Sequence, residues 1–502
     1  MSLKTFFIQT LAYHYHLQMQ RWSMQPIENQ KSTFRELIRT GKNTTFGKDF
    51  HFDRIYDYED FKREVPLTDY EGLKPYIERV KQGEKDVLWK GKPLYFAKTS
   101  GTTSGVKYIP ISRESMQNQI AGGRASLMSY IANSKDAKIF NGKMIFLQGS
   151  PELHEENGIN IGRLSGIVAH HIPKYALKNR LPSWETNCVE NWEEKIDKIC
   201  EETLPESMSV ISGIPPWMQN YFELLLQKTG KKNVAEIFPN LSLLVTGGVN
   251  FEPYKARFDE LLGKKIPNIE TYPASEGFIA YQDTLEPEGL LLCVNGGIFY
   301  EFIPLEEFHK EYPTRLALEE IELHKDYAIV LNTNAGLWGY VIGDTVQFVS
   351  KNPYRIKVSG RVKHFISAFG EHVIGNEVEH AMKIALEETG GQINEFTVAP
   401  QVNPTEGLPY HEWLVEFEKL PADLAQFSEI IDNELQKKNV YYYDLIQSKM
   451  LRPAVVTIIP KNGFNEYMKS VGKLGGQNKV PRLANDRNIA DALHQLLEDK
   501  LD

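Results

Sequence analysis

Hydroxyl and glycine residues gather in one segment of the chain, residues 98–107, with the sequence KTSGTTSGVK. Glycines let a backbone approach a bulky anion, while hydroxyl groups and successive amide N–H groups can donate hydrogen bonds to phosphate oxygens. Lys98 and Lys107 add positive charge at its two ends. The segment follows a β-rich run and lacks the Walker A pattern. It predicts a phosphate-binding loop, although a plain Ser/Thr/Gly surface loop has the same composition.

Two other segments bring carboxylates next to groups that could bind a nucleotide. In TYPASEG, Glu276 follows the hydroxyl of Ser275, a pair that could bind Mg²⁺ bridging phosphates, and Tyr272 could stack on a base. In YVIGD, Asp344 ends a predicted strand and could accept hydrogen bonds from ribose hydroxyls. Taken alone, each segment is also typical of an ordinary solvated turn.

Cations occur in two further glycine-containing segments. Arg361 and Lys363 lie in GRVKHFISAFG, which suits either a hinge between domains or a polar hairpin. Lys479 lies in GGQNKVPR, where a lysine on a glycine-rich loop could neutralise charge in a transition state. A frayed cationic tail is the competing interpretation near a C-terminus.

The elements that position these motifs indicate an α/β protein. The first 90 or so residues are predicted to be mainly helical; for example, Thr68 and Glu71 suggest a capping box before apolar residues at helical spacing, with Gly83 closing that helix. Short apolar runs then alternate with stretches long enough for helices, as in buried strands of an α/β domain. These runs are 94–97, 144–147, 208–211, 241–245, 290–294, 298–303 and 327–331.

The C-terminal part has a different pattern, which predicts a compact α+β unit. Helices are expected at 377–388 and 423–438, and strands at 395–399, 413–417 and 454–459. The seam is expected near 351–361. We therefore predict a large domain over residues 1–355 and a small, mobile lid domain over residues 360–502.

Composition narrows the class of protein. With 57 basic and 66 acidic side chains the net charge is −9, which argues against a general nucleic-acid binder. Three cysteines provide no disulfide framework, and no apolar run approaches the length that spans a membrane. Without a signal-peptide pattern at the start, we expect a cytoplasmic protein that does not bind membranes.

The order and spacing of the motifs resemble the adenylate-forming superfamily of acyl-CoA synthetases, luciferases and peptide-synthetase adenylation domains. Within it, 272–276 and 477–482 are most similar to the auxin-responsive acyl acid–amido synthetase family. This resemblance implies an ATP- and Mg²⁺-dependent ligase. It would adenylate a carboxylic acid, release pyrophosphate, and pass the acyl group to an amine, typically an amino acid.

The resemblance also implies a role for each motif residue. Tyr272 would lie against the adenine, Asp344 would bind the ribose, and Ser275 and Glu276 would face the α-phosphate and Mg²⁺. Lys479 would approach the α-phosphate when the lid closes. The remaining implied positions are Ser100, Gly101, Thr102 and Thr103 at the β- and γ-phosphates with Lys107 beside them, Thr246, Gly247 and Gly248 as an adenine-side loop, Arg361 at the nucleotide, Lys363 at the hinge, and Arg124 as a candidate for the substrate carboxylate.

Some residues differ from the superfamily pattern, and these differences indicate whether the product is an amide or a thioester. Ser367 replaces the lysine usual in the hinge motif, and the segment around Lys479 is not of the acyl-CoA synthetase type. These departures favour amide formation over the alternative of an acyl-CoA ligase. A non-catalytic nucleotide-binding or regulatory protein is the alternative from another class. The sequence does not disclose the acid, the amine or the oligomeric state.

Overall fold

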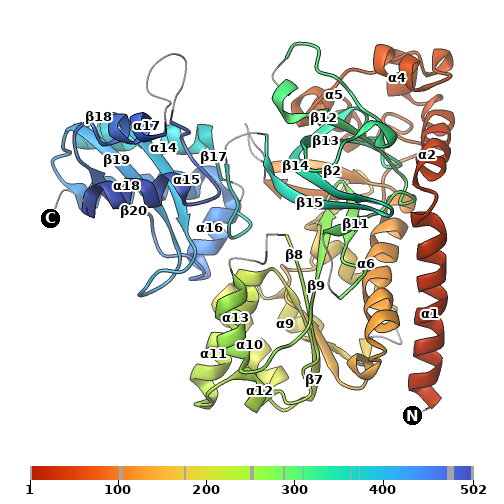
Figure 1. Ribbon diagram of the computed structural model, residues 1–502, viewed down its shortest axis with the longest axis horizontal. Coiled ribbons are helices and arrows are strands. Elements are labelled where there is room, and N and C mark those ends of the chain that lie inside the picture. The colour runs from red at the N-terminus through yellow and green to blue at the C-terminus, as the bar shows by residue number, and fades with distance from the viewer. Residues whose placement is uncertain are drawn as a thin grey trace. The chain divides into compact units, whose positions relative to one another are not determined.

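The protein is described by a computed structural model that covers most of residues 3–498 (Figure 1). The gaps are residues 101–105, 174–176, 249–250, 252–253, 286–288, 309, 363–364, 372 and 472–479. The described chain divides into two compact units. The first draws its residues from Met1–Thr99, Lys107–Glu190 and Glu194–Val362, and the second from Ser100–Val106, Asn191–Glu193 and Lys363–Asp502.

The first unit opens with a run of helices, as predicted. They are α1 (Leu3–Ser23), α2 (Pro26–Gly41), α3 (Thr45–Asp49), the 3₁₀ turn η1 (Phe52–Arg54), α4 (Tyr58–Glu64) and α5 (Tyr70–Lys81). The expected capping box of α5 is wrong, because Asp69 is the N-cap and its carboxylate accepts from the amides of Glu71 and Gly72. Thr68 instead pairs through its backbone with the start of β14 (Tyr340–Lys351).

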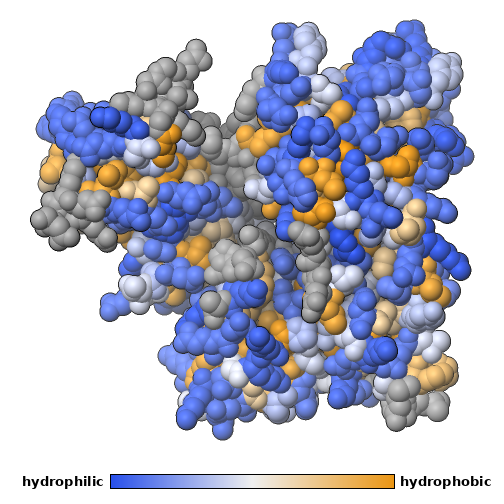
Figure 2. Space-filling model, viewed as in Figure 1, coloured by the Kyte–Doolittle hydropathy of each residue, from blue (hydrophilic) through white to orange (hydrophobic). Residues whose placement is uncertain are grey.

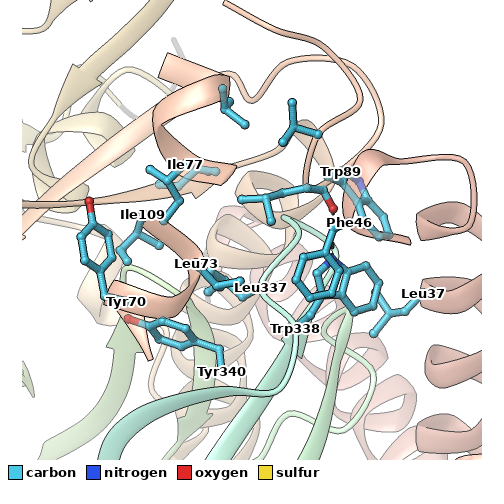
Figure 3. Packing of buried hydrophobic residues seen from close by; sticks show 14 of the residues in the cluster. Leu37, Phe46, Tyr70, Leu73, Ile77, Trp89, Ile109, Leu337, Trp338 and Tyr340 are labelled. Carbon is cyan, nitrogen blue, oxygen red and sulfur yellow. Dashed lines mark hydrogen bonds between the residues drawn. The ribbon is translucent and has the colours of Figure 1, made fainter. Parts of the chain in front are cut away.

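A hydrophobic cluster joins these helices to the strands that bear the motifs (Figure 3). Leu73 and Ile77 of α5 lie in it with Trp338 and Tyr340, and all four are almost fully buried. The indole of Trp338 donates a hydrogen bond to the Leu88 carbonyl oxygen at 3.1 Å. The beginning of β14 is therefore held firmly, four residues before Asp344.

The main sheet of the first unit has eleven strands in the order β12-β13-β14-β15-β11-β10-β9-β8-β7-β3-β6. Pairing is parallel from β9 to β6 and antiparallel from β12 to β9. The remaining bounds are β3 (Lys143–Phe146), β6 (Arg180–Leu181), β7 (Met208–Gly213), β8 (Leu243–Gly247), β9 (Asn268–Ala274), β10 (Gly277–Tyr281), β11 (Leu290–Leu292), β12 (Ile298–Pro304), β13 (Asp326–Thr333) and β15 (Tyr354–Arg361).

Helices connect and flank these strands, and the long helix α6 (Arg113–Ser134) lies beside α1 (Figure 1). The others are η2 (Lys138–Phe140), α7 (Leu164–Ala169), α9 (Trp184–Cys188), α10 (Trp192–Thr203), α11 (Pro215–Thr229), α12 (Val234–Ile237), α13 (Lys255–Leu262), η4 (Leu305–Glu307) and η5 (Leu318–Glu320). Helices α11 to α13 occupy the connections between parallel strands β7, β8 and β9. This α/β arrangement confirms the predicted fold class.

A smaller four-stranded sheet, in the order β2-β1-β5-β4, carries the hydroxyl-rich segment. Its strands are β1 (Tyr95–Ser100), β2 (Val106–Ile111), β4 (His154–Glu156) and β5 (Ile159–Gly162). Strand β1 runs parallel to β5, so the carboxyl ends of both strands point the same way.

The second unit is the predicted α+β type. Its sheet has the order β18 (Gln392–Gln401), β19 (Tyr410–Lys419) and β20 (Val455–Ile459), and β16 (Phe365–Ile366) pairs with β17 (Val373–Ile374). The helices are α14 (Gly375–Thr389), α15 (Leu424–Lys438), α16 (Val440–Gln447), α17 (Gly463–Ser470) and α18 (Asn488–Glu498). The expected helices and strands of this part are all present, within a few residues of their predicted bounds.

The domain limits at 355 and 360 stay a prediction, although β15 itself runs on to Arg361 within the first unit. Among the described residues, none of the helices has the length and apolar character needed to cross a lipid bilayer. Figure 2 shows hydrophilic residues over most of the visible face, with apolar residues in small patches between them.

Candidate functional site

Two of the predicted nucleotide residues touch each other. The phenol group of Tyr272 on β9 donates a hydrogen bond to Oδ2 of Asp344 on β14. Asp344 is only 7% exposed, so the bond orients a nearly buried carboxylate. The aromatic ring and the carboxylate, which lie 72 positions apart in the sequence, therefore belong to one place in the fold.

This contact requires a strongly curved sheet. Strands β10, β11 and β15 lie between β9 and β14, so a flat sheet would hold the two strands about 19 Å apart. That distance exceeds what a tyrosine and an aspartate can bridge. Tyr272 and Ile342 also pack against one hydrophobic cluster, so β9 and β14 contribute to the same core. Asp344 lies within β14 rather than at its end, just after Gly343, whose φ is +96°.

The carboxyl end of β8 forms the next part of the site. Thr246 is almost fully buried, and its backbone oxygen accepts a hydrogen bond from the Thr271 hydroxyl at 3.1 Å. A Cβ added to Gly247 would lie 2.7 Å from Thr271 Oγ1, so only glycine permits this close approach of the two strands. Gly248 has a φ of +85°, which favours glycine as well. The backbone at this edge is thus open to a flat ligand group.

Ser275 and Glu276 form the two-residue turn between β9 and β10, as predicted, and both are half-buried. Helix α6 supports this turn from behind, because the amide of Gln119 donates to the Ala274 carbonyl oxygen at 2.7 Å. In the same helix, a Cβ on Gly122 would lie 2.2 Å from the Phe278 ring. Gly122 therefore lets α6 pack closely against the β9–β10 hairpin, whose turn contains Glu276.

The strands that flank the hydroxyl-rich loop are rich in positive charge. Burial lowers the pKa of Lys98; Glu156 opposes this shift, and Arg163 and Lys81 add to it, so the three cations lie near one another with one carboxylate close by. The backbone amide of Tyr108 donates to the Tyr70 hydroxyl at 3.0 Å, which ties β2 to α5. Lys81 and Arg163 were not predicted as site residues, because each is an isolated cation in the sequence and only the fold brings them near Lys98.

Lys107 lies at the other end of the loop, with its Nζ 5.7 Å from the centre of the Tyr70 ring. Arg361 pairs with Asp344 across the β14–β15 ladder, so its backbone lies beside the predicted ribose residue. Arg124 is exposed on α6 and donates to the Tyr15 hydroxyl of α1 at 3.1 Å. Gly101, Thr102, Thr103, Lys363 and Lys479, with the side chains of Ser100 and Arg361, lie outside the described residues.

Comparisons with known proteins assign this arrangement to a family. The sequence model of the GH3 family N-terminal domain matches residues 16–187 and 176–267, the central domain matches 291–361, and the C-terminal domain matches 376–488. The chain belongs to the GH3 family. This confirms the family predicted from the motifs.

Curated GH3 relatives match over most of their length. The indole-3-acetic acid-amido synthetase GH3.3 of Arabidopsis thaliana is 23% identical, and the match covers 92% of this chain and 90% of the relative. The jasmonoyl–L-amino acid synthetase GH3.5 of Oryza sativa subsp. japonica is 23% identical, with 91% and 92% covered.

Solved structures share the fold of this GH3 chain. The AtGH3.15 acyl acid amido synthetase in complex with 2,4-DB aligns with a TM-score of 0.63 at 16% identity, covering 97% of this chain and 96% of the other. A 2-hydroxyisobutyryl-CoA ligase aligns with a TM-score of 0.58 at 14% identity, covering 94% and 93%. At these identities the likeness shows the adenylate-forming fold alone.

Proposed function

We propose that this GH3 protein is an acyl acid–amido synthetase. It activates a carboxylic acid with ATP, releases pyrophosphate, and transfers the acyl group to an amine, giving an amide and AMP. The observation that carries the proposal is the contact between Tyr272 and Asp344, because the residues predicted to bind the adenine and the ribose touch each other. Relatives named as amido synthetases support the amide product.

The residues around this contact suit ATP. Tyr272 offers a ring for the adenine, Asp344 a buried acceptor for ribose hydroxyls, and the glycine-rich end of β8 lets the backbone approach the base. Lys98, Lys81 and Arg163 form a positive spot, which Glu156 and Glu78 offset in part, in a chain of net charge −9. Such a spot attracts the triphosphate and stabilises its negative charge.

The donor set also suits Mg²⁺. Among the described residues no three carboxylate, histidine or cysteine side chains gather to hold a metal ion. Mg²⁺ typically takes one or two protein carboxylates and completes its shell with phosphate oxygens and water. Glu276, on a half-buried turn beside the hydroxyl of Ser275, offers such a carboxylate. When bound, the ion screens charge between the acid and the phosphate.

The rest of the machinery is proposed from the motifs. Lys479 approaches the α-phosphate, and Lys363 acts as the hinge on which a small domain moves between the two half-reactions. The loop 100–103 holds the β- and γ-phosphates, and Arg361 steadies the nucleotide. Arg124 remains a candidate for the substrate carboxylate. A cytoplasmic location and binding of neither nucleic acid nor membrane complete the proposal.

Exchange of labelled pyrophosphate into ATP tests the first half-reaction. We expect exchange that depends on a carboxylic acid, in a panel that includes indole-3-acetate and short aliphatic and aromatic acids. No exchange with any acid would favour a non-catalytic nucleotide-binding protein. Supplying CoA or a mixture of amino acids after activation then identifies the product. A thioester in place of an amide would favour the acyl-CoA ligase alternative.

A further inference from the structure

Three cations lie near the carboxyl end of β3; one of them, Arg163, also acts on Lys98, and the other two have no role assigned at the nucleotide. Arg163 lies over Gly149, since a Cβ there would be 3.1 Å from its Cδ. The guanidinium of Arg180, at the start of β6, donates to the Gln148 side-chain oxygen at 2.9 Å, and Gln148 donates to the Ser165 carbonyl oxygen. Arg163, Arg180 and Gln148 all belong to the first unit.

Lys195 on α10 completes this group. Its side chain is 2% exposed, and Nζ donates to the Asn187 carbonyl oxygen at 2.6 Å. Burial lowers the pKa of Lys195 to about 8; Cys188 opposes this shift and Arg163 adds to it, so Arg163 lies near Lys195. Burial also lowers the pKa of Arg180.

No carboxylate offsets two of these charges. Within the described part of the chain, neither Arg180 nor Lys195 forms an ion pair with a carboxylate, and Cys188 is the neighbour that raises the pKa of Lys195 against the effect of burial. The side-chain oxygen of Asn187 is buried nearby without a donor. Burying a cation such as Lys195 without a counter-charge costs free energy, and two half-buried arginines lie near it, so this arrangement favours a bound anion.

The position of these three cations in the fold indicates which kind of anion they would bind. In an α/β sheet, ligands bind outside the carboxyl ends of parallel strands. Strand β3 is two strands from β8, about 10 Å along this edge. Apolar side chains lie along this edge. A Cβ added to Gly213 would lie 3.0 Å from Leu147, and one added to Gly248 would lie 3.4 Å from Ile214. An acid whose carboxyl group reacts near the nucleotide would extend its far end toward β3.

We propose that the carboxyl end of β3, which the Arg180 side chain reaches from the start of β6, forms a subsite for a second carboxylate on the acyl acid, bound by Arg163, Arg180 and Lys195. The substrate class is then a dicarboxylic acid rather than a purely apolar acid. This inference rests on the proposed function, because it names the substrate of the adenylation step. The amino group of the second substrate must instead reach the activated carbonyl, so its own carboxylate stays close to the α-phosphate.

Matched acids in the pyrophosphate-exchange assay test the subsite. Glutarate, adipate and pimelate are compared with pentanoate, hexanoate and heptanoate. We expect kcat/KM to be about 10-fold or more higher for the dicarboxylates, as for gaining a charge-assisted hydrogen bond. Arg180→Gln and Lys195→Met are each expected to remove this preference through KM, while KM for ATP and the rates with monocarboxylates stay unchanged.

Lys198→Met is the matched control, because Lys198 lies on the same helix, is exposed, and pairs with Glu194. It should keep the preference, and Arg180→Lys, which keeps the charge, should keep part of it. Equal use of both acid series would overturn the subsite. An equal loss for all acids together with a higher KM for ATP would also overturn it, since the cations would then serve the phosphates.

A binding measurement separates this proposal from the ligase assignment. Adipate, in the presence of AMP, should raise the unfolding temperature of the wild-type protein and of Lys198→Met, but not that of Arg180→Gln. That result would support the subsite even if no acid gave exchange. Exchange with monocarboxylates without stabilisation by adipate would keep the ligase and overturn the subsite.

Discussion

The phenol group of Tyr272 donates a hydrogen bond to the carboxylate of Asp344 across a curve in the main sheet, although three strands lie between them. The bond orients the carboxylate and holds the ring beside it. Curvature of the sheet therefore brings the two motifs together. The predictions below test these two motifs and the residues proposed to act with them.

Removing the carboxylate of Asp344 should weaken nucleotide binding. We expect Asp344→Ala to reduce ATP affinity by roughly 1.5–3 kcal/mol, the usual range for hydrogen bonds to a charged group. Titration calorimetry with ATP measures the change. An unchanged affinity in a folded variant would show that the ribose binds elsewhere.

Substitutions at Tyr272 should separate its hydroxyl from its ring. Tyr272→Phe keeps the ring and loses the bond to Asp344, so we expect ATP affinity to fall by about 1 kcal/mol or less. Tyr272→Ala should cost about 1–3 kcal/mol more, because stacking on a base is lost. Equal effects of the two variants on the dissociation constant would argue against stacking.

Adding a methyl group at the end of β8 should disturb both stability and binding. In Gly247→Ala the Cβ would press on Thr271 Oγ1 and its carbonyl oxygen at 2.7 and 2.8 Å, so we expect a loss of about 1–3 kcal/mol in the free energy of unfolding. ATP binding should weaken as the edge shifts. Chemical denaturation and calorimetry measure the two effects.

Gly123→Ala is the control for that variant. Gly123 lies inside α6, and a Cβ there would meet no atom within 4 Å. We expect this substitution to raise stability by about 0.5–1 kcal/mol, the usual gain of alanine over glycine in a helix, and to leave ATP binding unchanged. A similar loss in both variants would contradict the steric account of Gly247.

Lys479 is expected to act on the transition state rather than on binding. Lys479→Ala should lower the adenylation rate by about 10²-fold or more, on the scale of one lost transition-state donor, with little change in ATP affinity. Single-turnover formation of the acyl-adenylate measures it, and Lys469→Ala on α17 is the matched cation control. Normal adenylation with slow amide formation would assign the lysine to the second half-reaction.

Much of the fold follows from local pattern. Apolar spacing predicted α5, and the runs at 208–211 and 298–303 became β7 and β12 because such segments must be buried. The capping residue of α5 was missed, since Asp69 and Thr68 are equally able to cap and the backbone of Thr68 is taken up by β14. Asp344 was expected at a strand end, but the strand continues past it after the kink at Gly343.

By itself, the sequence determined the chemical inventory of this protein: its helices and strands, its motifs, and through their order its membership of the GH3 family. Only the tertiary structure decided that Tyr272 meets Asp344, that Arg163 acts on Lys98, and that Lys195 is buried and Arg180 half-buried with no ion pair to a described carboxylate. The physical reason is that helix and strand preferences depend on residues close in the sequence. Contacts between residues far apart in the sequence depend on how the whole sheet packs and curves.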